Sequence, residues 1–384
     1  MKAQQILDKV PAVVAEWAKQ RADRQQRTKA DPDDYKQLRD IGIPLLAVPV
    51  EFGGTWEGLA KSARTIGTYL RTLAQGDPSI TLASSMHQGV LASWRVPTVP
   101  EPYNDSWQTQ RSEVFSTVTD GAWWGTIVSE PGSGGDTGKT QSLCIPDSPD
   151  TLSYRLSGQK HFGSGSGLTS FMTTRAIPEG ETGPDLFFME VRDQPWDGST
   201  GIRLAAEWRG HGMSSTNSHA FEFTSFPATR VAWPGHQAEL MAGNGSLGGM
   251  AFTSVIVGVV DAAMAYTKDW LKTNLANGSS LRAFQQVEWT MAEQEYWLIE
   301  QAWESGMRSF DNNTLERRTV LLAKENVARL AASVLDRLCK LSGGTAYTKY
   351  SPLGTWLQDV RALGYLRPPW ALAFDNMFNM SIED

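Results

Sequence analysis

Two periods of apolar residues divide the 384-residue chain into three regions. Over residues 1–115, apolar and charged residues recur at helical spacing, with Gly and Pro at the expected helix ends. Over 116–235 the pattern changes to short runs rich in β-branched and aromatic residues, such as "SFMTTRAI" and "DLFFMEV". Residues 236–384 return to long helical patterns. The patterns predict an N-terminal helical domain, a central β-domain of roughly six to eight strands, and a C-terminal helical domain.

The most apolar stretch, "GGMAFTSVIVGVVDAAMAY" at 248–266, contains Asp261 and several small residues. This composition is typical of a helix buried on all sides in a protein core rather than of a membrane span. In the first residues of the chain, apolar and charged positions alternate at helical spacing, and the uninterrupted apolar core of a signal peptide is missing. We therefore expect a cytoplasmic protein that does not contact a membrane.

Composition narrows the functional classes further. The formal net charge of −7 argues against a nucleic-acid-binding protein, which usually carries a basic face. The chain has two cysteines, Cys144 and Cys339, and no Cys/His cluster, so neither a disulfide framework nor a metal site is expected. A small-molecule substrate is the expected partner.

Five short strings carry the candidate chemistry, and their order along the chain is informative. Alone, "EPGSGGDTG" is typical of a surface β-turn and "SGGTAY" of a helix end. The five strings are "VSEPGSGGD" (128–136), "LSGQKHFGSGSG" (156–167), "EWRGHGMSSTNSHAFEF" (207–223), "FQQVEWTMAE" (284–293) and "SGGTAYTKYSPLGTWLQDVRA" (342–362). Together, and in this order, they resemble motifs of the acyl-CoA dehydrogenase superfamily of flavoproteins.

The resemblance implies an α+β multidomain fold with an N-terminal helical domain, a central β-barrel-like domain and a C-terminal four-helix bundle. It also implies a bound FAD, with FMN as the alternative and reduced flavin as a possible form. Members of this superfamily assemble through the helical bundle, so a homodimer or homotetramer is expected.

The resemblance also assigns residues to the flavin ring, a flat redox-active group whose edge takes hydrogen bonds from the protein. Ser129 stands where the family has Thr, and its hydroxyl is expected at the ring edge. Gly134 and Gly135 would let backbone N–H groups approach closely. Phe162 replaces the Trp that usually covers the ring, and Ser164 replaces the Thr near the reactive N5.

Two further places concern the tail of the cofactor. Gly343 and Gly344 match the glycine pair beside which the adenosine of another subunit's FAD usually lies. The family's R-x-Q-F-G loop, which helps to hold the pyrophosphate, is absent here, and Arg282 is the basic residue nearest to its place.

The segment "GYLRPPWALAFDN" at 364–376 departs most from the family pattern. In the dehydrogenases, a Glu that removes the proton α to the thioester stands where Arg367 falls when counted from Asp359. An arginine stays protonated and cannot act as that base. Asp261 and Asp375 are the nearest alternative carboxylates by position, and both are expected to be structural. Ordinary oxidation of an acyl-CoA is therefore not expected.

The arginine has its own expected place. Pro368 and Pro369 fix the turn and hold Arg367 in an extended conformation. We expect its guanidinium at the rim of the active site or on a carboxylate of the protein. It could attract an anionic substrate or the flavin phosphate, because its fork suits two oxygens at once. A rim salt bridge without a role in the chemistry is the alternative.

A sister branch of the superfamily keeps the fold and drops the Glu. These flavin monooxygenases, of the dibenzothiophene monooxygenase type, bind reduced flavin from a separate reductase and use O₂. The string "GQKHFGSGS" resembles their motif, and "GDPSITLASSMH" supplies the His that many of them have, His87. His87 and Ser164 are candidates to hydrogen-bond the reacting oxygen. A partly buried structural role for His87 is the alternative.

Three functions follow. The first is a flavin-dependent oxidoreductase without the usual Glu base, with monooxygenase-type chemistry slightly favoured. The second is an acyl-CoA dehydrogenase-type oxidation with a non-standard base, for which an electron-transfer flavoprotein would be a partner. The third is a non-catalytic relative that keeps the fold as a binding module. His87, Ser164 and Arg367 are the catalytic candidates.

Overall fold

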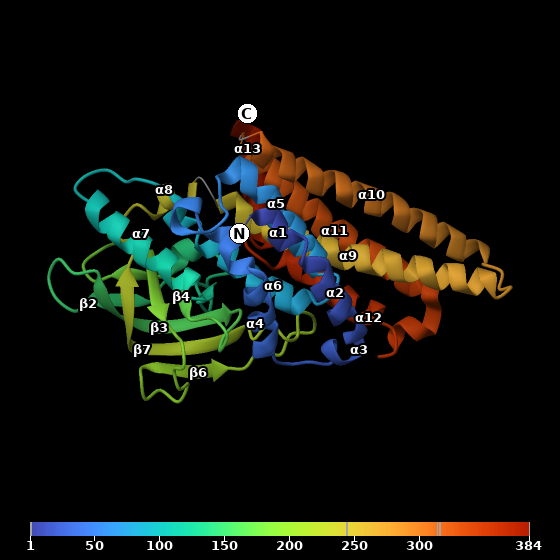
Figure 1. Ribbon diagram of the computed structural model, residues 1–384, viewed down its shortest axis with the longest axis horizontal. Coiled ribbons are helices and arrows are strands. Elements are labelled where there is room, and N and C mark those ends of the chain that lie inside the picture. Colours follow the sequence, from blue (N-terminus) through green and yellow to red (C-terminus); the bar gives the residue numbers. More distant parts are fainter. Residues whose placement is uncertain (1, 243–244, 313, 315, 384) are drawn as a thin grey trace.

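The computed structural model describes residues 2–242, 245–312, 314 and 316–383. Figure 1 shows a β-domain at one end of the molecule and long helices at the other, with the N-terminal helices between them. The helical, β and helical parts follow one another along the chain as the sequence predicts, so the predicted fold class is confirmed.

Short helices build the N-terminal part. Two of them start at an Asp-Pro pair, where the carboxylate caps the helix and the proline occupies its first turn. Asp31 accepts a hydrogen bond from the Asp33 N–H at 3.0 Å, and Asp77 accepts one from the Ile80 N–H at 3.0 Å. The helices are α1 (Ala3–Leu7), α2 (Val10–Lys19), α3 (Arg21–Arg24), α4 (Pro32–Ile41), α5 (Leu59–Leu73), α6 (Pro78–Val90) and α7 (Asn104–Thr119).

The β-domain contains seven strands within the described residues, as many as the sequence pattern predicts. They are β1 (Trp124–Thr126), β2 (Leu143–Pro146), β3 (Ser153–Gly163), β4 (Phe171–Pro178), β5 (Asp185–Glu190), β6 (Ile202–Ala206) and β7 (His219–Arg230). Pairing runs β4–β2–β3–β7–β5 and returns from β5 to β4, so these five strands close on themselves. β1 extends the sheet beside β4, and β6 pairs with β7. An apolar core that includes Leu156, Phe187 and Phe226 fills the interior.

Helices α9, α10 and α11 lie side by side in the C-terminal part, with α11 packed against both of the others (Figure 1). The shorter α12 packs on α11 and α9. The helices of this part are α8 (Gln237–Ala242), α9 (Gly245–Ala276), α10 (Ala283–Asp311), α11 (Arg317–Ser342), α12 (Leu353–Arg361) and α13 (Trp370–Glu383).

Helix α9 is the stretch whose apolar composition raised the question of a membrane span. By length and composition alone, Leu247–Ala276 could cross a membrane, but 78% of its most apolar window is buried inside the protein. It packs against α5, α6, α10, α11 and α12. α9 therefore has the surroundings of a core helix, as its sequence predicts.

The N-terminal and C-terminal helices share one apolar core, so they do not move as separate units. A polar contact on this interface involves Asp261 of α9, which accepts hydrogen bonds from Arg71 of α5 at 2.6 and 2.8 Å. Tyr296 of α10 donates to the same carboxylate at 2.8 Å. The contacts of Asp261 are those of a structural residue.

Candidate functional site

The loop 128–136 and the turn at 366–369 meet, although they lie at opposite ends of the sequence. Arg367 donates from its guanidinium to the Ser129 hydroxyl at 3.2 Å. Gly135 has φ of +83°, and a Cβ placed there would lie 2.8 Å from the Pro369 ring. Only glycine combines this backbone conformation with so close an approach. Loop and turn thus form one surface, with Ser129 and Arg367 on it.

A buried ion pair holds this loop on the barrel. Lys160 of β3 binds Glu130, and its ammonium also donates to the Arg175 carbonyl at 2.5 Å. Glu130 accepts a second bond from the Gln141 N–H at 2.7 Å. Burial opposes the ionisation of Glu130, but the Lys160 and Gln141 hydrogen bonds outweigh it and lower the pKa of this carboxyl. Burial lowers the pKa of Lys160 in turn. The pair is therefore structural, and Glu130 is not a free base.

Phe162 and Ser164 follow at the end of β3. The backbone N–H of His161 donates to the Ser129 carbonyl at 2.8 Å, which joins the end of β3 to the loop. Phe162 has φ of +62° and its side chain is 56% exposed, an unusual conformation that displays the ring on the surface. Ser164 is buried instead, and its hydroxyl hydrogen-bonds that of Ser218 at 2.8 Å. Phe162 is thus available to cover a planar ligand, whereas the Ser164 hydroxyl already has a protein partner.

Contacts with the C-terminal domain hold in place the surface that Phe162 and Trp208 form. Phe162 contacts Trp208 edge-on, with ring centroids 6.2 Å apart. The Met213 N–H, in the same loop as Trp208, donates to the Asp359 carboxylate of α12 at 2.6 Å. A Cβ at Gly212 would lie 2.4 Å from the Gln358 carbonyl oxygen, so the loop packs directly on α12. The third and fifth sequence strings meet here.

The glycine pair lies elsewhere, at the end of α11. Gly343 has φ of +68° and ends the helix, and Gly344 has open space around it. Both are exposed, and nothing in the described chain packs over them. Gln285 of α10 donates to the Leu341 carbonyl at 3.0 Å, which places the fourth string beside this helix end. The pair is accessible to another molecule, and its role in holding the cofactor tail remains a prediction.

His87 lies in the core of the N-terminal part and is fully buried. Its Nδ1 accepts a hydrogen bond from the Trp124 N–H at 2.9 Å, and its Nε2 lies 3.3 Å from the Pro44 carbonyl oxygen. Burial lowers the pKa of this imidazole to about 3, so it is neutral. Both ring nitrogens have protein partners, which matches the structural alternative. A catalytic role for His87 remains a prediction that this geometry does not support.

Arg367 was expected at a rim or on a carboxylate of the protein. Within the described residues its polar partner is the Ser129 hydroxyl and not a carboxylate, so the structure does not support the salt-bridge alternative. Burial, and secondarily the charge of Arg175, lower the pKa of Arg367 to about 10. The group is still protonated at neutral pH and cannot be a general base.

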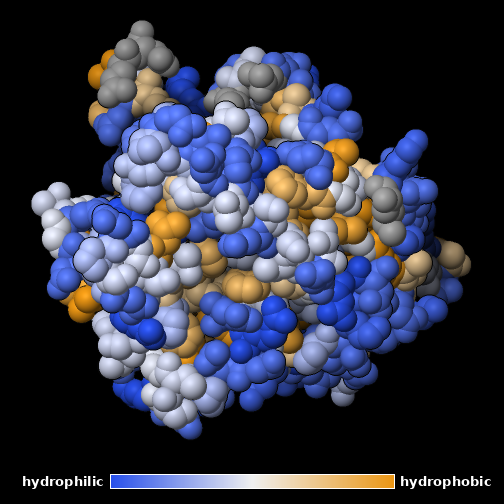
Figure 2. All heavy atoms as spheres, turned by 60° about the vertical axis from the view of Figure 1, so that its left-hand side comes forward, coloured by the Kyte–Doolittle hydropathy of each residue, from blue (hydrophilic) through white to orange (hydrophobic). Residues whose placement is uncertain are grey.

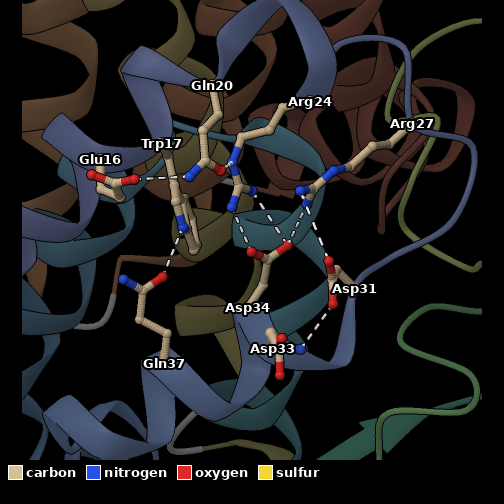
Figure 3. A pocket seen from close by; sticks show the side chains of 9 residues that line it. All are labelled: Glu16, Trp17, Gln20, Arg24, Arg27, Asp31, Asp33, Asp34 and Gln37. Carbon is tan, nitrogen blue, oxygen red and sulfur yellow. Dashed lines mark hydrogen bonds and ion pairs between the residues drawn. The ribbon is translucent and has the colours of Figure 1, made fainter.

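Two hollows lie away from this surface. One, of about 260 Å³, is polar, and in Figure 3 Arg24 and Arg27 point from one side toward Asp34 and Asp31 on the other. The Arg24 guanidinium binds Asp34 at 2.5 Å and Asp77 at 2.8 Å, so these charges hold α3 to α4 and α6. The second hollow, of about 470 Å³, lies on α10 beside Trp297. Neither contains a predicted site residue.

The residues around Ser129 fit a flavin. A flavin needs hydrogen-bond donors at the edge of its ring and apolar cover on its face. The Arg367 guanidinium and the Ser129 hydroxyl are donors on this surface, and Gly134 has φ of +61° with open space around it. Phe162 supplies an exposed aromatic face. Figure 2 shows hydrophobic residues as a broken band across the middle of the face that carries the β-domain.

Three charged residues near this surface are not among the residues that the sequence predicts for the site. Arg175 of β4 hydrogen-bonds the Thr137 hydroxyl at 2.5 Å, and Lys160 binds Glu130. Lys324 of α11 is buried and donates to the Pro368 carbonyl at 2.8 Å. Two of them interrupt an apolar pattern, since Arg175 stands in "SFMTTRAI" and Lys324 lies between the buried positions Val320 and Val327. A charged residue within an otherwise apolar pattern is the sequence signal that could have identified these two positions.

Comparison with known proteins gives the same fold. Residues 246–366 match the family model "Acyl-CoA dehydrogenase, C-terminal domain". The acryloyl-CoA reductase (NADH) of Anaerotignum propionicum is 21% identical over 86% of this chain and 81% of its own. A probable FMNH₂-dependent monooxygenase, SfnC of Pseudomonas putida, is 26% identical over 54% of this chain and 46% of its own.

Solved structures of both kinds superpose on almost the whole chain. KijD3 in complex with FMN and a dTDP-linked amino-keto sugar has a TM-score of 0.82 at 20% identity, covering 99% of this chain and 94% of its own. Butyryl-CoA dehydrogenase from Megasphaera elsdenii has a TM-score of 0.83 at 15% identity, covering 99% and 98%. The chain thus has the fold of the acyl-CoA dehydrogenase superfamily throughout, and its residues 246–366 match the acyl-CoA dehydrogenase C-terminal domain.

Proposed function

We propose that this chain is a flavin-dependent oxidoreductase of the monooxygenase type. The observation that carries the proposal is Arg367, a protonated guanidinium hydrogen-bonded to Ser129. By resemblance, this is where the dehydrogenases of the superfamily place their catalytic carboxylate. The neighbouring carboxylates do not replace it, because Glu130 is bound to Lys160 and Asp136 accepts a hydrogen bond from the Gly138 N–H at 2.9 Å.

The flavin, when bound, supplies the redox chemistry, and the chain supplies binding and orientation. Phe162 would cover one face of the ring, and Ser129 would hydrogen-bond its edge. The contact between Phe162 and Trp208, and the bond between Met213 and Asp359, would fix that aromatic cover. The names of two relatives favour FMN, since KijD3 and SfnC refer to FMN and FMNH₂, and FAD comes from the family resemblance. A reduced flavin delivered by a separate reductase is part of the proposal.

An acyl-CoA dehydrogenase-type reaction is the second candidate. The match of 246–366 to the dehydrogenase family and the long alignment with an acryloyl-CoA reductase favour it. It would need another carboxylate as the base. Asp375 is exposed on α13, and Asp261 is bound to Arg71 and Tyr296. The surroundings of these two carboxylates therefore do not favour either of them as the base.

The assembly and location of the protein belong to the same proposal. We expect a cytoplasmic homodimer or homotetramer that assembles through the C-terminal helices. Helix α13 supports this expectation, because its apolar residues recur every four positions on one exposed stripe. These residues are Trp370, Phe374, Phe378 and Ile382, with exposed fractions from 56% to 71%.

Flavin titration tests the proposed function. The apo-protein is titrated with FAD and FMN, each oxidised and, under anaerobic conditions, reduced, and the flavin fluorescence and visible spectrum are followed. At least one form should bind, and Phe162→Ala should weaken it by about tenfold, the effect of losing roughly 1.4 kcal/mol of aromatic contact. Trp297→Ala is the matched control, because Trp297 is 58% exposed on α10 and lies outside the five strings. Failure of every form to bind below about 0.1 mM, a free energy weaker than roughly −5.5 kcal/mol, would exclude the enzymatic functions and leave the binding-module alternative.

A further inference from the structure

Three positive side chains contact the loop that runs from Ser129 to Thr137: Arg367 donates to Ser129, Lys160 binds Glu130 and Arg175 donates to Thr137. The charge of Arg175 acts on Arg367, and the charge of Arg367 acts on Lys160, in each case lowering the pKa of the affected group. Lys160 is neutralised by Glu130. Two carboxylates, those of Asp185 and Asp136, act electrostatically on Arg175. Asp185 is buried and already bound to Arg230 at 2.6 Å, and Asp136 is half-buried. The cluster therefore retains positive charge.

Neither arginine of this cluster has a carboxylate partner. In the described chain, Arg367 donates one hydrogen bond, to Ser129, and the Arg175 guanidinium donates one, to Thr137. A guanidinium has five N–H donors, so most donors of both groups remain available to a ligand. Two such groups near each other also repel. By contrast, Arg230, another buried arginine of the β-domain, binds both Glu181 and Asp185.

The turn that carries Arg367 is held at a defined position. Buried Lys324 donates to the Pro368 carbonyl at 2.8 Å, and the Pro369 ring packs against Gly135. Arg175 is fixed by its place in β4, which pairs with β1, β2 and β5. The two cations thus project from rigid elements, as a preorganised binding site requires.

We propose that Arg367 and Arg175 form an oxyanion-binding subsite that takes a carboxylate or phosphate group. Planar guanidinium groups suit such an anion because they donate two parallel hydrogen bonds to its oxygens. Ser129 accepts from Arg367, so its own hydroxyl hydrogen stays free for the flavin edge while the remaining N–H groups of Arg367 face the anion. The identification of the bound group rests on the proposed function: it is either the carboxylate of an anionic substrate or the phosphate of the flavin.

Anion-dependent stability tests the subsite without any flavin. The melting temperature of the apo-protein is measured in chloride, in inorganic phosphate at matched ionic strength, and with benzoate against its neutral isostere benzamide. Phosphate or benzoate should stabilise the parent, by about tenfold in the folded-to-unfolded ratio at ten times its dissociation constant. Arg367→Gln and Arg175→Gln should lose this response, and benzamide should have no effect on any protein. Arg318→Gln, at an exposed arginine of α11, should respond like the parent.

The same variants distinguish a binding arginine from a structural one. In chloride, Arg367→Gln should be at least as stable as the parent, because it removes an unpaired charge. A large loss of stability, together with an unchanged anion response, would show a structural arginine and overturn the proposal. An equal response of parent and both variants to phosphate and benzoate would overturn it as well.

Flavin binding then separates the two sources of the anion. If the subsite takes the flavin phosphate, Arg367→Gln should weaken FMN by about tenfold or more and leave riboflavin unchanged. If it takes a substrate carboxylate, both flavins should bind the variant normally, and benzoate should perturb the spectrum of the bound flavin in the parent only. Absence of flavin binding in every protein would refute the proposed function and leave the anion response in place.

Discussion

Asp359 gives the clearest link between the structure and a measurable stability. It is buried on α12 and accepts the Met213 N–H at 2.6 Å, which ties the loop beside Phe162 to the C-terminal domain. Burial raises the pKa of this carboxyl to about 7, the Met213 hydrogen bond opposes the shift, and the charge of Asp77 adds to it. The positive charge of Arg24 does not fully neutralise the negative charge of Asp77, because Arg24 also binds Asp34.

The sign and size of the effect follow from linkage. The folded state keeps the proton of Asp359 up to about pH 7, whereas the unfolded chain loses it near about pH 4. The contribution of this group to the free energy of unfolding therefore falls as the pH rises between these values. A difference of about 3 pKa units at roughly 1.4 kcal/mol each gives about 4 kcal/mol as the upper limit.

Asp359→Asn removes the charge and keeps an oxygen for the Met213 N–H. Relative to the parent, the variant should be about 2–4 kcal/mol more stable near pH 8, about 1–2 kcal/mol more stable near pH 5 and nearly unchanged near pH 3. Urea denaturation of both proteins across this pH range measures the difference, with Asp375→Asn, at an exposed position of α13, as the control. A variant that is less stable than the parent by the same amount at every pH would refute the reasoning, because Asp359 would then be a stabilising charge.

Other variants probe the remaining contacts of the site. Lys160→Met leaves Glu130 buried without its partner and should cost about 3–5 kcal/mol in denaturation experiments, and adding Glu130→Gln should recover much of the loss. Equal stability of the parent and Lys160→Met would contradict the ion pair as an anchor of the loop. Phe374→Glu with Phe378→Glu places two charges on the exposed stripe of α13 and should lower the mass measured by light scattering, whereas Lys36→Glu on α4 should not. An unchanged mass would exclude α13 from the assembly interface.

The fold was largely predictable, because its information is local. Helical and strand periods marked the three regions that the structure contains. The five strings indicated the superfamily, and four of them (128–136, 156–167, 207–223 and 342–362) join one network of contacts. What no period could give is a contact such as Arg367 with Ser129, which spans 238 residues.

The charges of the site were less predictable than its glycines. Gly135 could be named from the loop pattern because a positive φ and a close approach both require glycine. The Arg175 side chain follows three successive buried positions of β4, and only the three-dimensional packing shows that it lacks a carboxylate partner. His87 illustrates the opposite case. Helix α6 is buried from Pro78 to Gln88, so a histidine that resembles a catalytic one lies in the core.

The most direct test of the account is whether a saturated acyl-CoA reduces the bound flavin. The flavin-loaded protein is mixed anaerobically with butyryl-CoA, the visible absorbance of the flavin is followed, and dithionite is added at the end to show that the flavin is reducible. Because general-base catalysis contributes about 10²–10⁴-fold and Arg367 stands in the place of the base, the flavin should stay oxidised until dithionite is added. Rapid bleaching by butyryl-CoA would contradict the account and show that the chain is an acyl-CoA dehydrogenase with another base.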